Sequence, residues 1–399
     1  MKKKHEIKLA ERMYRLPPYI FGELNALKLK KRQHGIDVID LGMGNPDQPS
    51  LEKAVQKLTD VVSRDPKTHR YSRSRGLPHL LRAAGDKYKD VFDVKLDPDE
   101  EIIATIGSKE GVSHLALALL GPGDSAIVPT PAFPIHVWSV VLAGANVINL
   151  EMGNINTFTT RLAHSVDNLW PKPKVLYLNF PHNPTTAVVE SAFYQEVVEY
   201  CKKHDIIIIN DFAYCDITFD GYKAPSLLSV PGAKDIAVEF TTMSKSYNMA
   251  GWRVGFCAGN KEIVNALARL KGYYDYGIFT PIQVASIMAL REPMDSVKKI
   301  AGLYETRRDV LVEGLNKAGW KIEKPKATMF VWAPIPEEYK HMGSEKFAKM
   351  LIEKAEVCVA PGIGFGESAD GYLRMALVEN ADRLKQAVKQ INRALKIKV

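Results

Sequence analysis

The chain has 399 residues, of which 46% are hydrophobic and 25% charged, and its formal net charge is +8. These proportions are typical of a soluble globular protein, and the length suffices for one large core and a smaller one, so we expect two lobes. No apolar run approaches the roughly 18 residues of a membrane span. The basic start of the chain lacks the apolar segment of a signal peptide. The four cysteines show no paired spacing, which indicates a reducing, cytoplasmic location.

The positive charge raises nucleic-acid binding as an alternative. The basic residues are spread along the chain, however, without interleaved aromatic residues or a known reading motif. A dinucleotide site is also poorly supported, because Gly42 and Gly44 lack a third glycine and Pro46 falls where a helix should begin. We therefore expect neither nucleic acid nor a membrane as a partner, and we predict no metal site.

Apolar runs that alternate with helical stretches organise the middle of the chain. The strand-like runs lie at 102–106, 126–129, 175–179, 206–210, 236–241 and 254–258. Their alternation with helices predicts an α/β fold with a mostly parallel sheet covered by helices on both faces. A long helix is predicted over 296–318, followed by mixed strands and helices that include 331–332 and 373–375. We expect residues 46–295 to form a large cofactor-binding domain, and residues 1–45 and 296–399 to form a smaller α+β domain.

The first of these strands leads into a turn of small residues. Gly107 and Ser108 follow the run 102–106, and a helical stretch begins just after them. Free backbone N–H groups and the helix dipole make such a turn an anion site, to which Ser108 adds a hydroxyl. An ordinary strand-to-helix turn would have the same pattern.

Two further strands end in polar residues suited to hold a ring. The run 175–179 enters a loop in which Asn183 precedes Pro184, and its amide could donate to a ring oxygen, although Asn-Pro is also a common turn signal. Four isoleucines precede Asp211, placing it at the carboxyl end of a buried strand, where open α/β sheets bind ligands. Asp211 could pair with a protonated ring nitrogen and Tyr214 could reach the ring oxygen. Asp211 could instead cap the next helix.

The most informative motif is Ser244-Lys245-Ser246, followed by Arg253 between two glycines. Lys245 is a candidate amine for a Schiff base, and Arg253 a fixed fork for a phosphate, which the neighbouring hydroxyls could share. An aldehyde cofactor that carries a phosphate needs this pairing, and pyridoxal 5′-phosphate (PLP) is the obvious one. Because most lysines are simply solvated, this motif depends on the other three for support.

Together the motifs resemble the class I/II aminotransferases, PLP enzymes of fold type I, over essentially the whole chain. The order and spacing of Asn183, Asp211, Tyr214, Lys245 and Arg253 match that family. The resemblance implies that Lys245 holds PLP as a Schiff base and then moves a proton at the substrate Cα. It also implies that Asp211 meets the pyridine nitrogen, while Tyr214 and Asn183 meet the ring oxygen.

The same resemblance implies the remaining contacts to the cofactor. Phe133 would stack over the ring, and the phosphate ligands would be Ser108, the Lys109 backbone, Ser244 and Arg253. Tyr71 matches a family tyrosine that reaches the phosphate across a dimer interface, and Thr280 could do likewise. We therefore expect a homodimer with shared active sites.

Substrate contacts are implied at four further positions. Arg374 matches the family's arginine for the substrate α-carboxylate, for which bidentate guanidinium geometry is the physical reason. Without the resemblance it would pass for an ordinary surface arginine. Gly44 would complete the carboxylate site with its backbone, and Tyr19 would contact substrate. Lys109, with its free ammonium, is a candidate for the distal carboxylate of glutamate.

Within the family, the chain is most similar to bacterial alanine aminotransferases, which interconvert alanine and pyruvate using glutamate and 2-oxoglutarate. The likeness lies in 15–19, 72–76, 244–253 and 360–366. The chain departs from the broader pattern at Thr186, where a glycine is usual, and at Phe133, where many relatives have tyrosine or tryptophan.

Other activities stay open as alternatives. They are an aspartate or LL-diaminopimelate aminotransferase, and another PLP reaction such as that of a decarboxylase or a carbon–sulfur lyase. Arg374 argues against decarboxylation, because a clamped carboxylate favours loss of the Cα proton. A PLP sensor fused to a DNA-binding module is disfavoured, since about 45 residues before the large domain leave no room for such a module.

Overall fold

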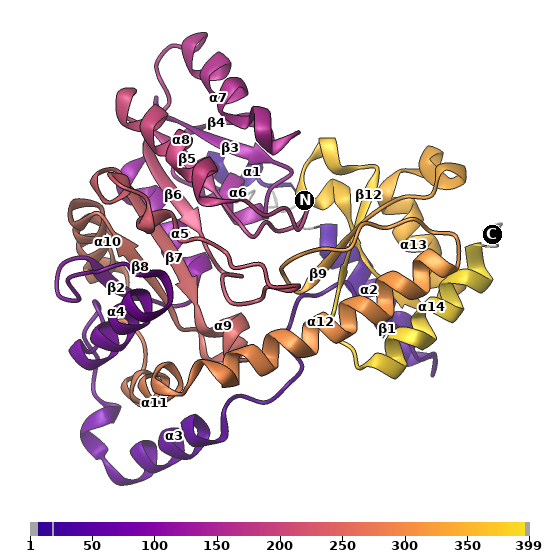
Figure 1. Ribbon diagram of the computed structural model, residues 1–399, viewed down its shortest axis with the longest axis horizontal. Coiled ribbons are helices and arrows are strands. Elements are labelled where there is room, and N and C mark those ends of the chain that lie inside the picture. Colours follow the sequence, from indigo (N-terminus) through magenta and orange to yellow (C-terminus); the bar gives the residue numbers. More distant parts are fainter. Residues whose placement is uncertain (1–6, 18–19, 396–399) are drawn as a thin grey trace, which may run out of the picture.

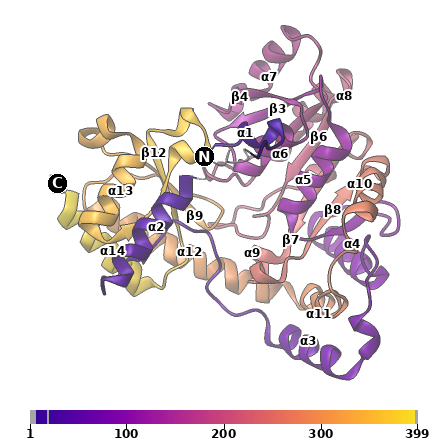
Figure 2. The ribbon, with the colours of Figure 1, turned by 180° about the vertical axis from the view of Figure 1, so that it is seen from behind.

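The computed structural model describes residues 7–17 and 20–395 of the chain, arranged in two lobes (Figure 1). One lobe is built around a large sheet, and the other around a small sheet next to the C-terminal helix. The helix α12 (Met294–Lys317) runs from below the large sheet into the small lobe, as the view from behind also shows (Figure 2). Its observed start is two residues before the predicted one.

The large lobe contains a seven-stranded sheet with the order β2-β8-β7-β6-β5-β3-β4. All neighbours from β7 to β4 are parallel, and β8 is antiparallel to both β2 and β7. The mostly parallel sheet is therefore confirmed. The strands are β2 (Ile102–Thr105), β3 (Ser125–Thr130), β4 (Asn146–Glu151), β5 (Val175–Leu178), β6 (Ile207–Asp211), β7 (Ala237–Thr242) and β8 (Gly255–Gly259).

Strand β4 is the one strand of this sheet that the sequence analysis did not predict. It lies at the edge of the sheet, and only Leu150 among its six residues is buried. An edge strand buries little side-chain area, so its sequence lacks the continuous apolar run of a central parallel strand.

Helices cover both faces of the large sheet. Successive residues of a strand point to opposite faces, and Ile208 and Ile209 of β6 accordingly belong to two separate apolar clusters. One cluster packs against α4 (Pro78–Phe92), α7 (Phe158–Asp167) and α8 (Ser191–Lys203), and the other against α5 (Ser108–Leu119), α6 (Pro134–Leu142) and α10 (Lys261–Tyr274). Burial on both faces explains why the central strands are almost wholly apolar.

The small lobe has its own sheets and its own apolar cluster. Strand β12 (Tyr372–Ala376) lies between β11 (Ala360–Pro361) and β9 (Phe330–Pro334) in an antiparallel sheet. The N-terminal strand β1 (Ile39–Asp40) pairs in parallel with β10 (Val357–Cys358), and Leu24 and Leu41 are buried in the same cluster as Leu373. Residues 24–41 therefore pack in this lobe. Its helices are α2 (Ile20–Gln33), α13 (Gly343–Ala355) and α14 (Ala381–Leu395).

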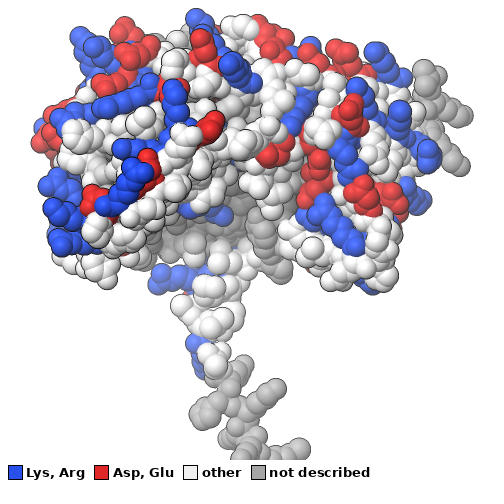
Figure 3. All heavy atoms as spheres, turned by 90° about the horizontal axis from the view of Figure 1, so that it is seen from below, with Lys and Arg blue, Asp and Glu red and all other residues white. Residues whose placement is uncertain are grey.

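Four shorter or peripheral helices complete the architecture, namely α1 (Glu11–Tyr14), α3 (Glu52–Arg64), α9 (Met243–Ser246) and α11 (Thr280–Arg291). None of the helices in the described residues combines the length and the apolar character needed to cross a bilayer. On the face shown in Figure 3, Lys and Arg side chains are interspersed with Asp and Glu rather than gathered in one basic patch.

Candidate active site

A cavity of about 280 Å³ lies where the carboxyl ends of the large-lobe strands meet the small lobe. Parallel strands end at one edge of a sheet, so side chains that follow β2, β5, β6 and β7 come together there. Most of the predicted site residues line this cavity: Gly44, Ser108, Lys109, Phe133, Asn183, Asp211, Tyr214, Ser244, Lys245, Arg253 and Arg374. The cavity is thus a single polar site built from both lobes.

Lys245 projects into this cavity from the short helix α9. The helix begins directly after β7, and the Thr242 side chain caps it by accepting a hydrogen bond from Ser244 N. The Lys245 ammonium donates to the Gly44 carbonyl at 2.7 Å. Burial, together with the nearby charge of Arg374 and Arg253, lowers the pKa of Lys245 to about 8. An amine with this pKa is partly neutral near pH 7, as a nucleophile or base must be.

Asp211 is the last residue of β6, and its two carboxylate oxygens differ. Oδ2 lies 3.0 Å from His136 Nε2, whereas the buried Oδ1 accepts no hydrogen bond from any residue that the structure describes. A buried acceptor without a donor is costly, so Oδ1 is suited to receive an N–H from a ligand, as the pyridine nitrogen of PLP would supply. The helix-cap alternative does not hold, because the next helical turn begins only at Leu227.

His136 was not predicted as a site residue. It is buried on α6, three residues after Phe133, and its ring stacks near Tyr177 with the centroids 6.0 Å apart. The only available signal was an imidazole in an otherwise apolar helix. A histidine in such a helix is usually part of the core. Its partner here, Asp211, lies on a different element, so the sequence alone does not reveal the contact.

Asn183 and Tyr214 lie side by side on the cavity wall. Asn183 Nδ2 donates to the Tyr214 hydroxyl at 3.5 Å, and its Oδ1 accepts from Arg374 Nη1 at 2.7 Å. Burial raises the pKa of Tyr214, although Arg374 opposes this effect. The phenol therefore stays protonated and can donate a hydrogen bond to a ring oxygen.

A cradle for an anion is formed by residues 106–108, Ser244 and Arg253, which we call the phosphate cradle. A Cβ on Gly107 would lie 2.2 Å from Arg253 Nη2, and a Cβ on Gly255 would lie 2.8 Å from Ser108 N. Glycine at 107 thus lets the guanidinium approach this loop, and glycine at 255 lets the start of β8 approach the start of α5. Arg253 itself has a φ of +57°, a strained backbone of the kind that gathers at functional sites. The backbone N–H groups, the guanidinium and the Ser244 hydroxyl fit a phosphate.

Arg374 lies on β12 and is buried rather than on the surface. Its guanidinium carbon is 4.1 Å from the ring centroid of Phe330 and 4.7 Å from that of Phe365. Its Nη1 donates to Asn183, and its Nη2 to the Gly42 carbonyl at 3.3 Å. Two aromatic faces therefore hold the fork in a fixed plane inside the cavity, which suits bidentate binding of a carboxylate. Neither phenylalanine was singled out from the sequence.

Two predicted residues that the structure describes do not line the cavity of their own chain. The Tyr71 side chain is 85% exposed, and its ring contacts that of Tyr276 at a centroid distance of 4.5 Å. Thr280 begins α11, outside the cavity. Tyr19 lies outside the described residues.

A second, larger cavity of about 540 Å³ lies beyond the loop that carries Asn183. Trp332 and Tyr372 line it, and so does Thr186, whose φ is +62°. Neither Lys245 nor Arg374 lines it, so of these two cavities only the smaller one brings the Lys245 amine and the Arg374 guanidinium together.

Comparison with known proteins assigns the family. The family described as aminotransferase class I and II matches residues 36–391. Over 380 residues the chain is 52% identical to the glutamate-pyruvate aminotransferase AlaC of Escherichia coli, covering 95% of this chain and 92% of that protein. It is 40% identical to the LL-diaminopimelate aminotransferase of Moorella thermoacetica over 386 residues, covering 97% of this chain and 98% of that protein.

A solved structure agrees with this assignment. Substrate-bound BacF from Bacillus subtilis superposes with a TM-score of 0.91 at 32% sequence identity, over 97% of this chain and 98% of that one. Relatives and fold both span nearly the whole chain. It therefore belongs to the class I and II aminotransferases, enzymes that use pyridoxal 5′-phosphate as their cofactor.

Proposed function

We propose that this chain transfers the amino group between L-alanine and 2-oxoglutarate, yielding pyruvate and L-glutamate, at the cavity that contains Lys245. The observation that carries the proposal is that the Lys245 amine and the buried Arg374 guanidinium line one small cavity. A substrate whose α-carboxylate binds Arg374 would present its α-amino group towards Lys245. The 52% identity to a glutamate-pyruvate aminotransferase supports the choice of substrates.

In this proposal, different cavity residues contact different parts of the cofactor. When bound, pyridoxal 5′-phosphate supplies an aldehyde carbon that accepts amines and a pyridinium ring that withdraws electrons. Asp211 Oδ1 would accept the pyridine N–H, with His136 fixing the carboxylate from its other oxygen. Tyr214 and Asn183 would contact the ring oxygen and Phe133 the ring face. The phosphate cradle would hold the phosphate, with Lys109 contributing its backbone.

Lys245 would both hold the cofactor and move a proton at the substrate Cα. Its lowered pKa keeps a useful fraction of Nζ neutral at physiological pH, so Nζ can take up the Cα proton and return it. Arg374 clamps the carboxylate, which favours breaking the Cα–H bond over loss of CO₂. Gly44 accepts from Lys245 Nζ and so orients the amine.

The enzyme must accept both a three-carbon acid and a five-carbon dicarboxylate. Lys109 is exposed at the edge of the cavity, one residue beyond the start of α5. We propose that its ammonium meets the distal carboxylate of glutamate and 2-oxoglutarate. Alanine and pyruvate have no group at that position, so they would not use it.

We further propose that the active unit is a homodimer with shared sites. Tyr71 is exposed and absent from its own cavity, which is expected of a side chain that completes the partner's phosphate site, and Thr280 would act in the same way. Two further tyrosines are exposed in the chain segment that contacts Tyr71. Tyr273, near the end of α10, is 88% exposed, and Tyr276, in the turn after α10, is 63% exposed. Exposed aromatic side chains of this kind mark an interface.

Mixed dimers test the shared sites. Lys245→Ala and Tyr71→Ala chains should each be nearly inactive alone, whereas a mixture that has exchanged subunits should regain activity from hybrids with one intact site. A mixture that stays inactive after exchange has been verified would contradict the shared site.

We propose the same domain limits as those expected from the sequence, with residues 46–295 in the large domain and residues 1–45 and 296–399 in the small one. The separate apolar clusters of the two lobes support this division. We also propose a cytoplasmic location, because four buried cysteines without disulfides suit a reducing compartment.

The substrate assignment is tested by half-reactions of the cofactor-loaded enzyme with single amino acids. L-alanine and L-glutamate should react faster than L-aspartate or LL-diaminopimelate, followed by the change in the visible absorbance of the cofactor. Lys109→Ala should slow the reaction of glutamate but not that of alanine, and Lys89→Ala, which removes an exposed lysine of α4, should slow neither. A faster reaction with aspartate or LL-diaminopimelate would reassign the donor.

A further inference from the structure

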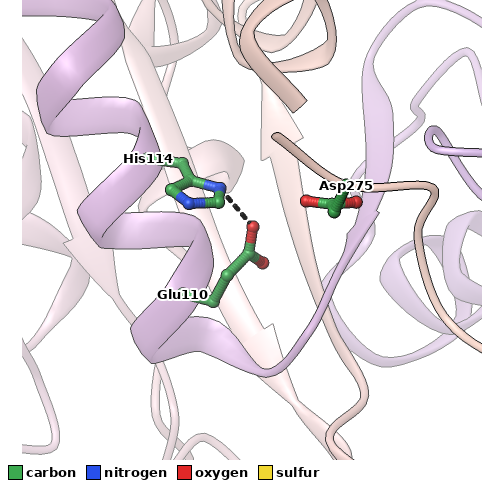
Figure 4. A group of neighbouring side chains, drawn as sticks. All are labelled: Glu110, His114 and Asp275. Atoms are coloured by element: carbon green, nitrogen blue, oxygen red, sulfur yellow. Dashed lines mark ion pairs between the residues drawn. The ribbon is translucent and has the colours of Figure 1, made fainter. Parts of the chain in front are cut away.

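A cluster of ionic side chains lies beside the phosphate cradle, outside the cavity. Glu110 and His114 face each other on α5, and Asp275 lies across from them on the turn after α10 (Figure 4). Acidic groups and an imidazole at this spacing resemble a cation site. Here, however, the Lys271 ammonium, which is fully buried, lies 2.9 Å from both Glu110 Oε1 and Asp275 Oδ2. The two carboxylates therefore share a cation supplied by the chain itself.

One side of this cluster supports the phosphate cradle. Glu110 Oε2 accepts from Ile106 N at 2.7 Å, and its Oε1 lies 2.5 Å from His114 Nδ1. Burial would raise the pKa of Glu110, but the hydrogen bonds from His114 and Lys271 outweigh burial and hold it below its usual value. The Glu110 carboxylate thus stays charged and fixes the loop that leads into Ser108.

The other side of the cluster supports residues 71–77, which we call the arm. Asp275 Oδ1 accepts from Gly277 N at 2.6 Å, and this fixes the turn on which Tyr276 contacts Tyr71. Gly277 packs so closely on the arm that a Cβ there would lie 2.7 Å from the Arg73 carbonyl oxygen.

A second contact holds the arm to α11. The buried Gln283 accepts from Leu77 N and donates to Ser72 Oγ, both at 2.7 Å. The arm is therefore a supported segment whose exposed end is Tyr71, and the turn set by Asp275 is one of its supports.

We propose that Lys271 is a positioning residue for two active sites at once, because its ammonium joins the phosphate cradle of its own chain to the arm that carries Tyr71 into the partner's site. Lys271 acts on the cradle through Glu110 and on the arm through Asp275. The inference rests on the shared-site dimer proposed above. Removal of Lys271 leaves two partly buried carboxylates facing each other without that cation, and the cradle and the arm each lose a support.

Hybrid dimers with a single live site separate the two roles. One chain keeps Lys245 and the other carries Lys245→Ala, and two different affinity tags allow purification of the hybrid. The live site then combines the cradle of the first chain with the arm of the second. The readout is the fraction of Lys245 that carries a pyridoxyl group after borohydride reduction, measured by mass spectrometry across a range of PLP concentrations. It reports cofactor binding rather than turnover.

The expected effects depend on which chain carries the change. Asp275→Asn should raise the half-saturating PLP concentration about tenfold, in the usual range of couplings between sites, when it is on the Lys245→Ala chain, and leave it unchanged on the live chain. Glu110→Gln should show the reverse pattern. Lys271→Met should raise that concentration in either chain. The two milder changes keep the test valid if Lys271→Met does not fold.

Two controls decide what a negative result means. Tyr71→Ala on the Lys245→Ala chain should weaken PLP capture at the live site, and no effect would overturn the shared-site dimer itself. If Tyr71→Ala acts but Asp275→Asn and Lys271→Met on that chain do not, only the role of Lys271 is overturned. Arg308→Met removes another fully buried cation, which lies on α12 and is paired with Asp220, and should lower stability without changing PLP capture from either chain.

Discussion

The lowered pKa of Lys245 makes a quantitative prediction about its reactivity. A shift from 10.5 to about 8 corresponds to a free-energy difference of about 3 kcal/mol between the charged and neutral forms, relative to a solvated lysine. At pH 7 roughly 10% of an amine with a pKa of 8 is neutral, against about 0.03% at a pKa of 10.5. We therefore expect the neutral fraction of Lys245 at pH 7 to be several hundred times that of an ordinary lysine.

Two substitutions should move this pKa in opposite directions. Burial is its largest cause, the charge of Arg374 comes next, and Asp211 opposes both. Arg374→Leu should raise the pKa of Lys245 because a neighbouring positive charge is lost. Asp211→Asn should lower it further because the stabilising negative charge is lost. These signs do not depend on the size of the burial effect.

Competitive labelling of the apoenzyme with trace acetic anhydride measures this pKa directly. The acetylation of Lys245, followed by peptide mass spectrometry from roughly pH 6 to 11 against an added amine standard, should rise through an inflection near 8. Lys87 is an internal control: burial would lower its pKa, but the Asp216 carboxylate at 2.6 Å outweighs burial and raises it, so Lys87 should react little. A wild-type inflection near 10.5, or shifts of the same sign in both variants, would refute the reasoning.

Three further predictions concern single side chains. Asp211→Ala should retain PLP, seen by absorbance, but lose several kcal/mol of transition-state stabilisation, and near wild-type kcat would show that the unpaired Oδ1 has no catalytic partner. His136→Leu should lower kcat about 10- to 100-fold by releasing Asp211, and an unchanged kcat would mean that Asp211 orients itself. Thr186→Gly should raise the free energy of unfolding by about 0.5–1 kcal/mol in urea titrations by relieving a positive φ, and a loss of stability would show that the threonine side chain is needed there.

The local parts of the site were predictable because each one depends on a short stretch of sequence. A buried parallel strand needs a continuous apolar run, and the polar residue that ends such a run lies at the edge where ligands bind. Asp211 follows from this rule, and Asn183 follows from its place before Pro184 in the loop that such a run enters. Lys245 and Arg253 lie close enough together in the sequence to suggest one amine and one anion-binding fork.

The rest of the site depends on contacts between segments far apart in the sequence. His136 can be recognised as a site residue only because α6 brings it to within 3.0 Å of Asp211. Phe330 and Phe365 can be recognised only because two small-lobe segments place their rings against the Arg374 guanidinium. Asp275 is only four residues from Lys271, but the second carboxylate partner of Lys271, Glu110, comes from α5. No spacing within the sequence records such contacts.

The measurement that tests the site most directly is the covalent position of the cofactor. Borohydride reduction of the PLP-loaded protein, followed by digestion and mass spectrometry, should place the pyridoxyl group on Lys245, and Lys245→Ala should leave no reduced adduct and no transamination. An adduct on another lysine, such as Lys109 or Lys271, would contradict the account of the active site.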